Sequence, residues 1–175
     1  MKDYDFILKF ELPGHDTDPE QFVDALYESG CDDASVGIGQ QGRIALNFIR
    51  QSESALDAIL SAISDVKKAI PGVKLIEATP DLVGLTDIAD ILGFSRQNMR
   101  KIAVKNKSAF PAPVHDGTVS LWHLFKVLKW FKASKAYNIE DSLIEVSRTN
   151  MQVNFASQMR DIDPKLQNSL QSILN

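Results

Sequence analysis

Three observations predict an α+β fold for this chain of 175 residues. Segments with an apolar period of two residues alternate with segments of period 3.6 over residues 1–78. Two short amphipathic helices joined at Gly93 follow within residues 81–135. Two more helical patterns lie in residues 136–175. We therefore expect an N-terminal domain of strands and helices, a central helical domain and a C-terminal helical arm.

The N-terminal domain is predicted to have the element order β-α-β-β-α-β. Strands are expected at residues 4–12, 34–38, 43–50 and 73–78, and helices at residues 19–29 and 54–70. Asp18 and Pro19 form an N-cap and first-turn pair, and Pro71-Gly72 ends the second helix. The apolar stripe of that helix is expected to hold Leu56, Ile59, Leu60, Ile63, Val66 and Ile70. This order is that of a ferredoxin-like sandwich, in which two helices cover an antiparallel sheet.

The ferredoxin-like order does not by itself specify a function. RNA binding through the sheet is rejected, because the strand at residues 43–50 lacks paired aromatic side chains and the domain is acidic. A dimer or partner surface, a sensor of a small ligand and a folded spacer remain open, and the partner or dimer surface is favoured. Thr79-Pro80-Asp81 is expected to be a short linker.

Residues 85–107 have the pattern of a helix-turn-helix. Thr86 is expected to cap the first helix, and Gly93 to end it in the left-handed conformation. Ser95 is expected to cap a second helix that begins at Arg96. The buried side of the pair is expected to hold Ile88, Ala89, Leu92, Phe94, Met99, Ile102 and Ala103.

The polar side chains on the outside of the second helix suit DNA. Arg and Lys can bind guanine edges or phosphates, and Gln and Asn can pair with adenine. The candidate DNA-binding residues are Ser95, Arg96, Gln97, Asn98, Arg100, Lys101, Lys105, Lys107 and His115. We expect Arg96, Gln97 and Arg100 on bases, because such motifs read bases from the start of the second helix. The alternative is an αα-hairpin with a solvated polar face.

The residues that follow predict a wing. Phe110 to Val114 cannot be helical, since prolines occupy two of the five positions. Asp116-Gly117 predicts a turn, residues 119–122 a return strand, and Leu124 to Phe131 a helix. Two helices, a hairpin and a helix form a winged helix-turn-helix.

Residues 83–131 resemble the MerR-like and excisionase-like winged-helix domains of bacterial and phage DNA-binding proteins. The matching segments are VGLTDIADILGFSRQNMRK, FPAPV, LW and KWF. The resemblance implies binding to double-stranded DNA without naming a particular operator.

The charge distribution agrees with this interpretation, although the net charge is −4. Residues 1–95 carry 7 basic and 17 acidic side chains, a net charge of −10. Residues 96–135 carry 9 basic side chains against Asp116 alone, a net charge of +8. Residues 136–175 have a net charge of −2. The positive charge therefore lies where a DNA-binding face is expected.

The sequence offers no support for catalysis, a metal or a cofactor. It contains no G-x-S-x-G, no phosphate-binding glycine loop and no H-E-x-x-H. Cys31 is the single cysteine, which excludes an internal disulfide and a cysteine zinc cluster. His15, His115 and His123 are far apart in the sequence, and His123 is interpreted as structural. The N-terminus does not resemble a signal peptide, and no apolar run could span a membrane. We expect a cytoplasmic protein that does not bind membranes.

The C-terminal residues 136–175 predict a long helix at 140–159 and a last helix after Asp163-Pro164. The apolar face of the last helix holds Leu166, Leu170, Ile173 and Leu174. These helices either pack on their own chain or form a dimerisation arm, and a homodimer is favoured. The sequence therefore predicts a transcriptional regulator that binds double-stranded DNA as a homodimer. The alternative is an excisionase-like DNA-bending protein, or an adaptor that recruits a partner through its acidic N-terminal domain.

Overall fold

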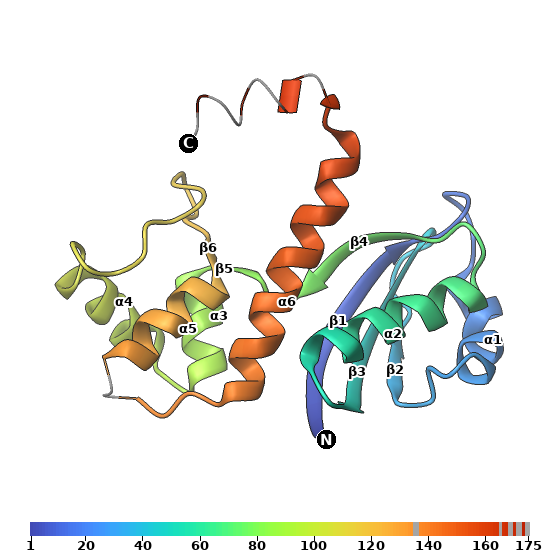
Figure 1. Ribbon diagram of the computed structural model, residues 1–175, viewed down its shortest axis with the longest axis horizontal. Coiled ribbons are helices and arrows are strands. Elements are labelled where there is room, and N and C mark those ends of the chain that lie inside the picture. Colours follow the sequence, from blue (N-terminus) through green and yellow to red (C-terminus); the bar gives the residue numbers. More distant parts are fainter. Residues whose placement is uncertain (135–136, 165, 168–169, 171–172, 174–175) are drawn as a thin grey trace.

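Two lobes lie on either side of one long helix, α6 (Asp141–Gln158) (Figure 1). The computed structural model describes residues 1–175 except 135–136, 165, 168–169, 171–172 and 174–175. The N-terminal lobe contains a four-stranded sheet, and the second lobe consists mainly of helices. The chain therefore combines helices with an antiparallel sheet, as the α+β expectation requires.

The sheet of the N-terminal lobe has the strand order β2-β3-β1-β4, and each neighbouring pair is antiparallel. Its strands are β1 (Lys2–Glu11), β2 (Ala34–Gly37), β3 (Arg43–Ser52) and β4 (Lys74–Thr79). The helices are a 3-10 turn (Pro19–Phe22), α1 (Val23–Glu28) and α2 (Ala55–Ala69). Asp18 and Ser54 cap the 3-10 turn and α2 through their side chains, as such residues do in N-cap positions.

The core of this lobe lies between one face of the sheet and α2. Alternate residues of β1 and β3 are buried, and the rings of Phe6 and Phe48 stack at 5.3 Å. The buried residues of α2 are Ala55, Ala58, Ile59, Ala62 and Val66. The expected stripe of α2 was therefore wrong at Leu56 and Leu60, which are 52% and 50% exposed. Small alanines form the buried face instead, so the two leucines point outward.

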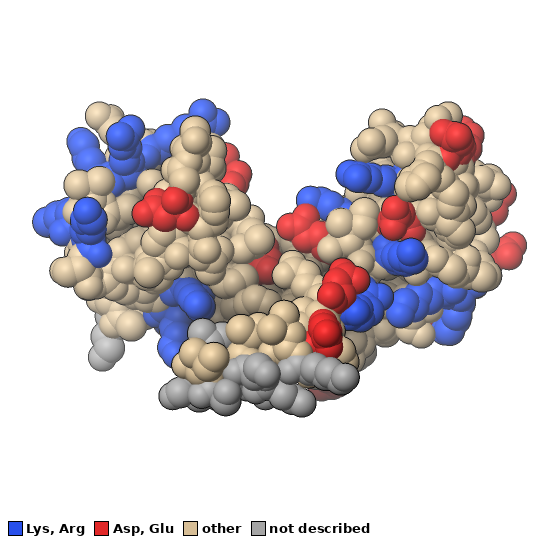
Figure 2. Space-filling view, turned by 90° about the horizontal axis from the view of Figure 1, so that it is seen from above, with Lys and Arg blue, Asp and Glu red and all other residues tan. Residues whose placement is uncertain are grey.

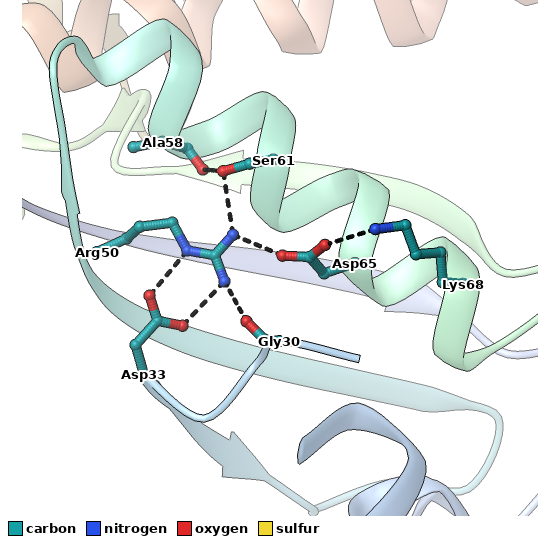
Figure 3. Close-up of polar contacts among 7 residues, drawn as sticks. All are labelled: Gly30, Asp33, Arg50, Ala58, Ser61, Asp65 and Lys68. Carbon is teal, nitrogen blue, oxygen red and sulfur yellow. Dashed lines mark hydrogen bonds and ion pairs between the residues drawn. The ribbon is translucent and has the colours of Figure 1, made fainter. Parts of the chain in front are cut away.

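Arg50 is only 8% exposed and forms hydrogen bonds with three parts of the N-terminal lobe (Figure 3). Its guanidinium donates two hydrogen bonds to Asp33 and one to Asp65, at 2.8–2.9 Å. It also donates to Ser61 Oγ at 3.0 Å and to the carbonyl oxygen of Gly30 at 2.7 Å. Burial alone would lower the pKa of Arg50, but the hydrogen bonds to both carboxylates raise it above its ordinary value. The contacts join β3, α2 and the loop before β2.

The second lobe contains a helix pair, a short two-stranded sheet and a third helix. Its elements are β5 (Leu82–Val83), α3 (Leu85–Leu92), α4 (Arg96–Lys105), β6 (Trp122–His123) and α5 (Leu124–Ala133). Its core includes Ile88, Ala89, Met99, Leu124, Val127, Leu128 and Phe131. Gly93 ends α3 with φ +67°, and Ser95 caps α4. Both expectations are confirmed.

Two expectations about this lobe were wrong. Thr86 lies inside α3, because the helix begins at Leu85 and Gly84 is its N-cap residue. The Asp87 carboxylate accepts the N–H of Gly84 at 2.8 Å. Of the return strand expected at 119–122, Val119 and Ser120 are not in a strand, Leu121 forms an isolated bridge with His115, and Trp122 begins β6. β6 pairs instead with β5, which follows the linker directly.

Helix α6 packs against both lobes of its own chain. It contacts β1, β4 and α2 on one side and α5 on the other. Its Asn154 side chain accepts the N–H of Ala78 at 2.7 Å and donates to the carbonyl oxygen of the same residue at 2.9 Å. β4 is an edge strand of the sheet, so Asn154 fills a place that a further strand would take. The long helix of the expected C-terminal arm thus joins the two lobes.

The last residues extend beyond this helix. Leu166, Leu170 and Ile173 are 54%, 42% and 79% exposed, and Leu174 lies outside the described residues. In the described part of the chain, no helix is long and apolar enough to cross a membrane.

Candidate nucleic-acid interface

Helix α4 lies at the outer end of the second lobe, away from α6 (Figure 1). Ser95 has extended backbone angles of φ −71° and ψ 146°, and its hydroxyl accepts the N–H of Asn98 at 3.1 Å. Met99 is fully buried. Ile102 and Ala103 are partly buried and pack against the same core, so this side of the helix faces inward and its polar side chains face solvent.

Aromatic packing fixes the turn before α4. The Phe94 ring contacts those of Phe131 and Tyr137, with centroid distances of 5.8 and 5.2 Å. At the other end, Asn106 Nδ2 donates to the carbonyl oxygen of Ile102 at 2.8 Å. A helix held at both ends presents its outer side chains in a defined geometry, which a binding site requires.

The structure places all nine candidate residues on the surface. Eight of them form one run, Ser95 to Lys107, on α4 and the turns that flank it. His115 lies apart from this run, on the loop that leads to β6. Figure 2 shows Lys and Arg gathered on the outer surface of this lobe, with acidic side chains closer to its centre, and charges of both signs on the N-terminal lobe.

Within the part of the chain that the structure describes, the cations of this run have no carboxylate partner. Among the described residues, none of Arg96, Arg100, Lys101, Lys105 and Lys107 forms an ion pair. Several cations elsewhere do: Lys9 pairs with Glu77, and Lys132 with Asp141. The run is therefore a surface of uncompensated positive charge, which attracts anions over several ångströms.

The loop from Pro111 to Leu121 has one tight position. A Cβ atom added at Gly117 would lie 2.6 Å from His115 Nε2, so a larger residue would displace the imidazole. Ser120 Oγ donates to Asp116 at 2.9 Å and closes the turn. His115 lies at the base of this turn, where its backbone pairs with that of Leu121.

Helix α5 adds cations that the choice of site residues missed. Lys126 and Lys129 are exposed and form no ion pair with any described residue. The regional net charge of +8 already included both lysines. The net charge of this region could therefore have led to the inclusion of both lysines among the candidate site residues.

The sequence analysis also missed a buried polar cluster between the lobes. His123 Nδ1 lies 2.7 Å from Asp81 Oδ1, and Asn154 Nδ2 donates to Asp81 Oδ2 at 2.8 Å. The three residues are at most 6% exposed. They are separated by 31 or more positions in the sequence, and no local pattern connects them.

In the described part of the chain, no group of three or more His, Cys, Asp or Glu side chains could hold a metal ion. Burial raises the pKa of the Cys31 thiol to about 11, which disfavours the reactive thiolate. Comparisons with protein-family models, with curated proteins and with solved structures gave no match.

Proposed function

We propose that this chain binds double-stranded DNA and regulates transcription, with α4 in the major groove. The observation that carries the proposal is the exposed run from Ser95 to Lys107, whose cations lack ion-pair partners among the described residues. The order α3, α4, β6, α5 with the loop 111–121 before β6 supports a winged helix-turn-helix. The strand order of the N-terminal lobe supports a ferredoxin-like sandwich.

The residues of the run are assigned two roles. Arg96, Gln97 and Arg100 contact base edges, because they lie at the start of the helix and can form bidentate hydrogen bonds. Asn98, Lys101, Lys105 and Lys107 contact phosphates, with His115 approaching the backbone from the loop. Neutralising about five phosphates gives a slope of about −4 to −5 per protomer when log affinity is plotted against log salt concentration.

We further propose a cytoplasmic homodimer. One winged domain buries only about 600–1,000 Å² on DNA, and two-fold symmetry doubles this contact. The exposed side chains of Leu166, Leu170 and Ile173 are the candidate dimer contact, because apolar side chains in a row at a chain end favour burial.

A second candidate is an adaptor or a DNA-bending protein that recruits a partner through its N-terminal lobe. The net charge of −7 over residues 1–79, from 7 basic and 14 acidic side chains, favours it, together with the exposed Leu56 and Leu60 on α2. A regulator protects one discrete site, whereas a bending protein distorts DNA across several adjacent sites.

The experiment is selection of bound fragments from genomic DNA, followed by footprinting of the enriched fragments. We expect enrichment of a few fragments that share a short sequence, with half-sites about one helical turn apart. Footprints over several adjacent sites, with altered DNA mobility, would support the bending protein. Equal recovery of all fragments, or none, would contradict sequence-specific binding.

A further inference from the structure

Val104 is an exposed apolar side chain within the cationic run of α4. It is 68% exposed, more than any other large apolar side chain between residues 82 and 133. Valine is a weaker helix former than the lysine and arginine residues around it, so helix propensity does not favour valine at this position. Neither of the two roles assigned to the run includes Val104. Its place on the helix decides what it can contact.

Val104 lies on the outer side of α4, in line with residues to which we assign base contacts. A helix turns by about 100° per residue, so Val104 and Gln97 lie within about 20° of each other around the axis. Arg100 lies between them along the axis and about 40° from Val104. Met99 and Ile102, which pack in or against the core, lie about 140–160° away. Val104 therefore faces in the same direction as Gln97 and Arg100.

The spacing of these residues suits the floor of the major groove. A recognition helix that lies along the groove reads bases from positions such as i, i+3 and i+7. In α4 these positions are Gln97, Arg100 and Val104. Four residues of helix rise by about 6 Å, and successive base pairs are about 3.4 Å apart. Val104 would therefore meet a base about two base pairs from the one that Arg100 contacts.

The major groove offers one apolar group that a valine side chain can contact. All four bases present hydrogen-bond donors or acceptors there, but thymine alone adds a 5-methyl group. The valine side chain neither donates nor accepts hydrogen bonds, whereas burial of a methyl group against it removes apolar surface from water. Thymine is therefore the base that Val104 can distinguish from the other three.

The charges around Val104 favour DNA over a protein as the molecule that covers it. Arg100, Lys101 and Lys105 lie within four residues of Val104 and form no ion pair with any described residue. An apolar protein surface placed on Val104 would remove these cations from water without supplying anions, which is costly. The phosphates that line the groove supply the anions and leave the groove floor to Val104.

We propose that Val104 contacts the 5-methyl group of a thymine in the major groove and thereby selects a T·A pair at that position. This contact rests on the DNA binding that is proposed for α4. It adds a residue that determines sequence preference without a hydrogen bond.

The test replaces thymine by deoxyuridine, one position at a time, in the selected genomic duplex. This replacement removes the 5-methyl group and leaves the base pair intact. At one position in each half-site, we expect wild type to bind about fourfold more weakly, because one methyl contact is lost. At every other thymine, the affinity should stay unchanged.

A matched pair of variants assigns this effect to one side chain. Val104→Ser removes both methyl groups at similar helix propensity, so it should bind the thymine and deoxyuridine duplexes equally. Val119→Ser makes the same change at a 62% exposed valine outside α4 and should keep the fourfold response of wild type.

The results distinguish a failure of this contact from a failure of DNA binding. If wild type binds the selected duplex but deoxyuridine weakens binding at no position, the contact of Val104 with thymine is refuted and DNA binding stands. An equal response to deoxyuridine in wild type and Val104→Ser would assign the methyl contact to another residue. No binding to any duplex would refute both.

Discussion

Arg50 places a positive charge inside the N-terminal lobe, and its hydrogen bonds involve each of its three guanidinium nitrogens. We predict that Arg50→Met destabilises the protein by about 3 kcal/mol, because Asp33 and Asp65 lose the cation that offsets their partial burial. The measurement is the free energy of unfolding in urea. Lys68→Met, at an exposed partner of Asp65, should cost less than about 1 kcal/mol. Equal losses of unfolding free energy in the two variants would show that the contacts of Arg50 stabilise the lobe no more than an exposed ion pair does.

A second prediction at the scale of single residues concerns Tyr4 and Glu145. The Tyr4 hydroxyl donates to Glu145 Oε2 at 2.7 Å, which lowers the pKa of Glu145, with a further contribution from Lys2. The same hydrogen bond raises the pKa of Tyr4 to about 12. A lowered carboxyl pKa stabilises the fold above the unfolded value of about 4.3, and this contribution is lost as the pH falls through the folded value.

Tyr4→Phe should therefore be less stable than wild type at pH 6, and the difference should shrink at pH 3. Urea unfolding at both pH values measures it. A constant difference between the two proteins would mean that the hydroxyl acts without shifting the Glu145 titration. Tyr27→Phe, at a hydroxyl that is not bonded to Glu145, is the control.

At the scale of elements, the signals that predicted α4 are local. Ser95, Gly93 and the buried Met99 each act within one or two turns, so the sequence alone located the helix and the run of cations on it. The cap of α3 was misassigned because Thr86 and Asp87 are adjacent and both can accept a backbone N–H. The local sequence therefore does not show which of the two side chains accepts the backbone N–H at the start of α3.

The remaining elements depend on contacts that are distant in the sequence. β5 and β6 are two residues each and pair across about 40 positions, which no apolar period predicts. The same holds for the junction cluster of Asp81, His123 and Asn154. The sequence predicted α4 and its run of cations, but neither the junction cluster nor the role of α6 at the edge of the sheet.

A prediction on α6 follows from Asn154. Asn154→Leu keeps the side-chain size but leaves the N–H and carbonyl of Ala78 and one oxygen of Asp81 without this partner. We expect a loss of at least about 3 kcal/mol in the free energy of unfolding, since each of the three unpaired groups costs about 1–3 kcal/mol. Faster hydrogen exchange at the Ala78 amide should accompany it. Gln152→Leu, at an exposed position of the same helix, should change neither quantity.

At the scale of the whole molecule, α6 packs against both lobes, and the residues beyond it expose Leu166, Leu170 and Ile173. We predict that the full chain is a dimer at tens of micromolar, and that a chain ending at Asp161 is a folded monomer. Light scattering measures both masses. A dimer that survives this truncation would move the interface to the N-terminal lobe, and a monomeric full chain would contradict the dimer itself.

The DNA complex that we propose combines two scales, since α4 supplies the contacts and the charge distribution supplies the attraction. Residues 1–79 carry 7 basic and 14 acidic side chains, a net charge of −7, so the second lobe is expected to face DNA and the N-terminal lobe to face away. If net charge alone determined the affinity for DNA, every exposed arginine would contribute equally. We propose instead that the arginines of α4 contribute most, because they contact bases.

The most direct measurement is the affinity of Arg96→Ala, Arg100→Ala and Arg43→Ala for a selected genomic duplex and for a scrambled duplex. Arg43 is an exposed arginine of β3 in the N-terminal lobe and serves as the control. We predict that each α4 variant loses about 1–3 kcal/mol on the selected duplex and less on the scrambled one, because a bidentate base contact is removed. Arg43→Ala should bind both duplexes as wild type does. Unchanged binding of the selected duplex by both α4 variants would contradict the account.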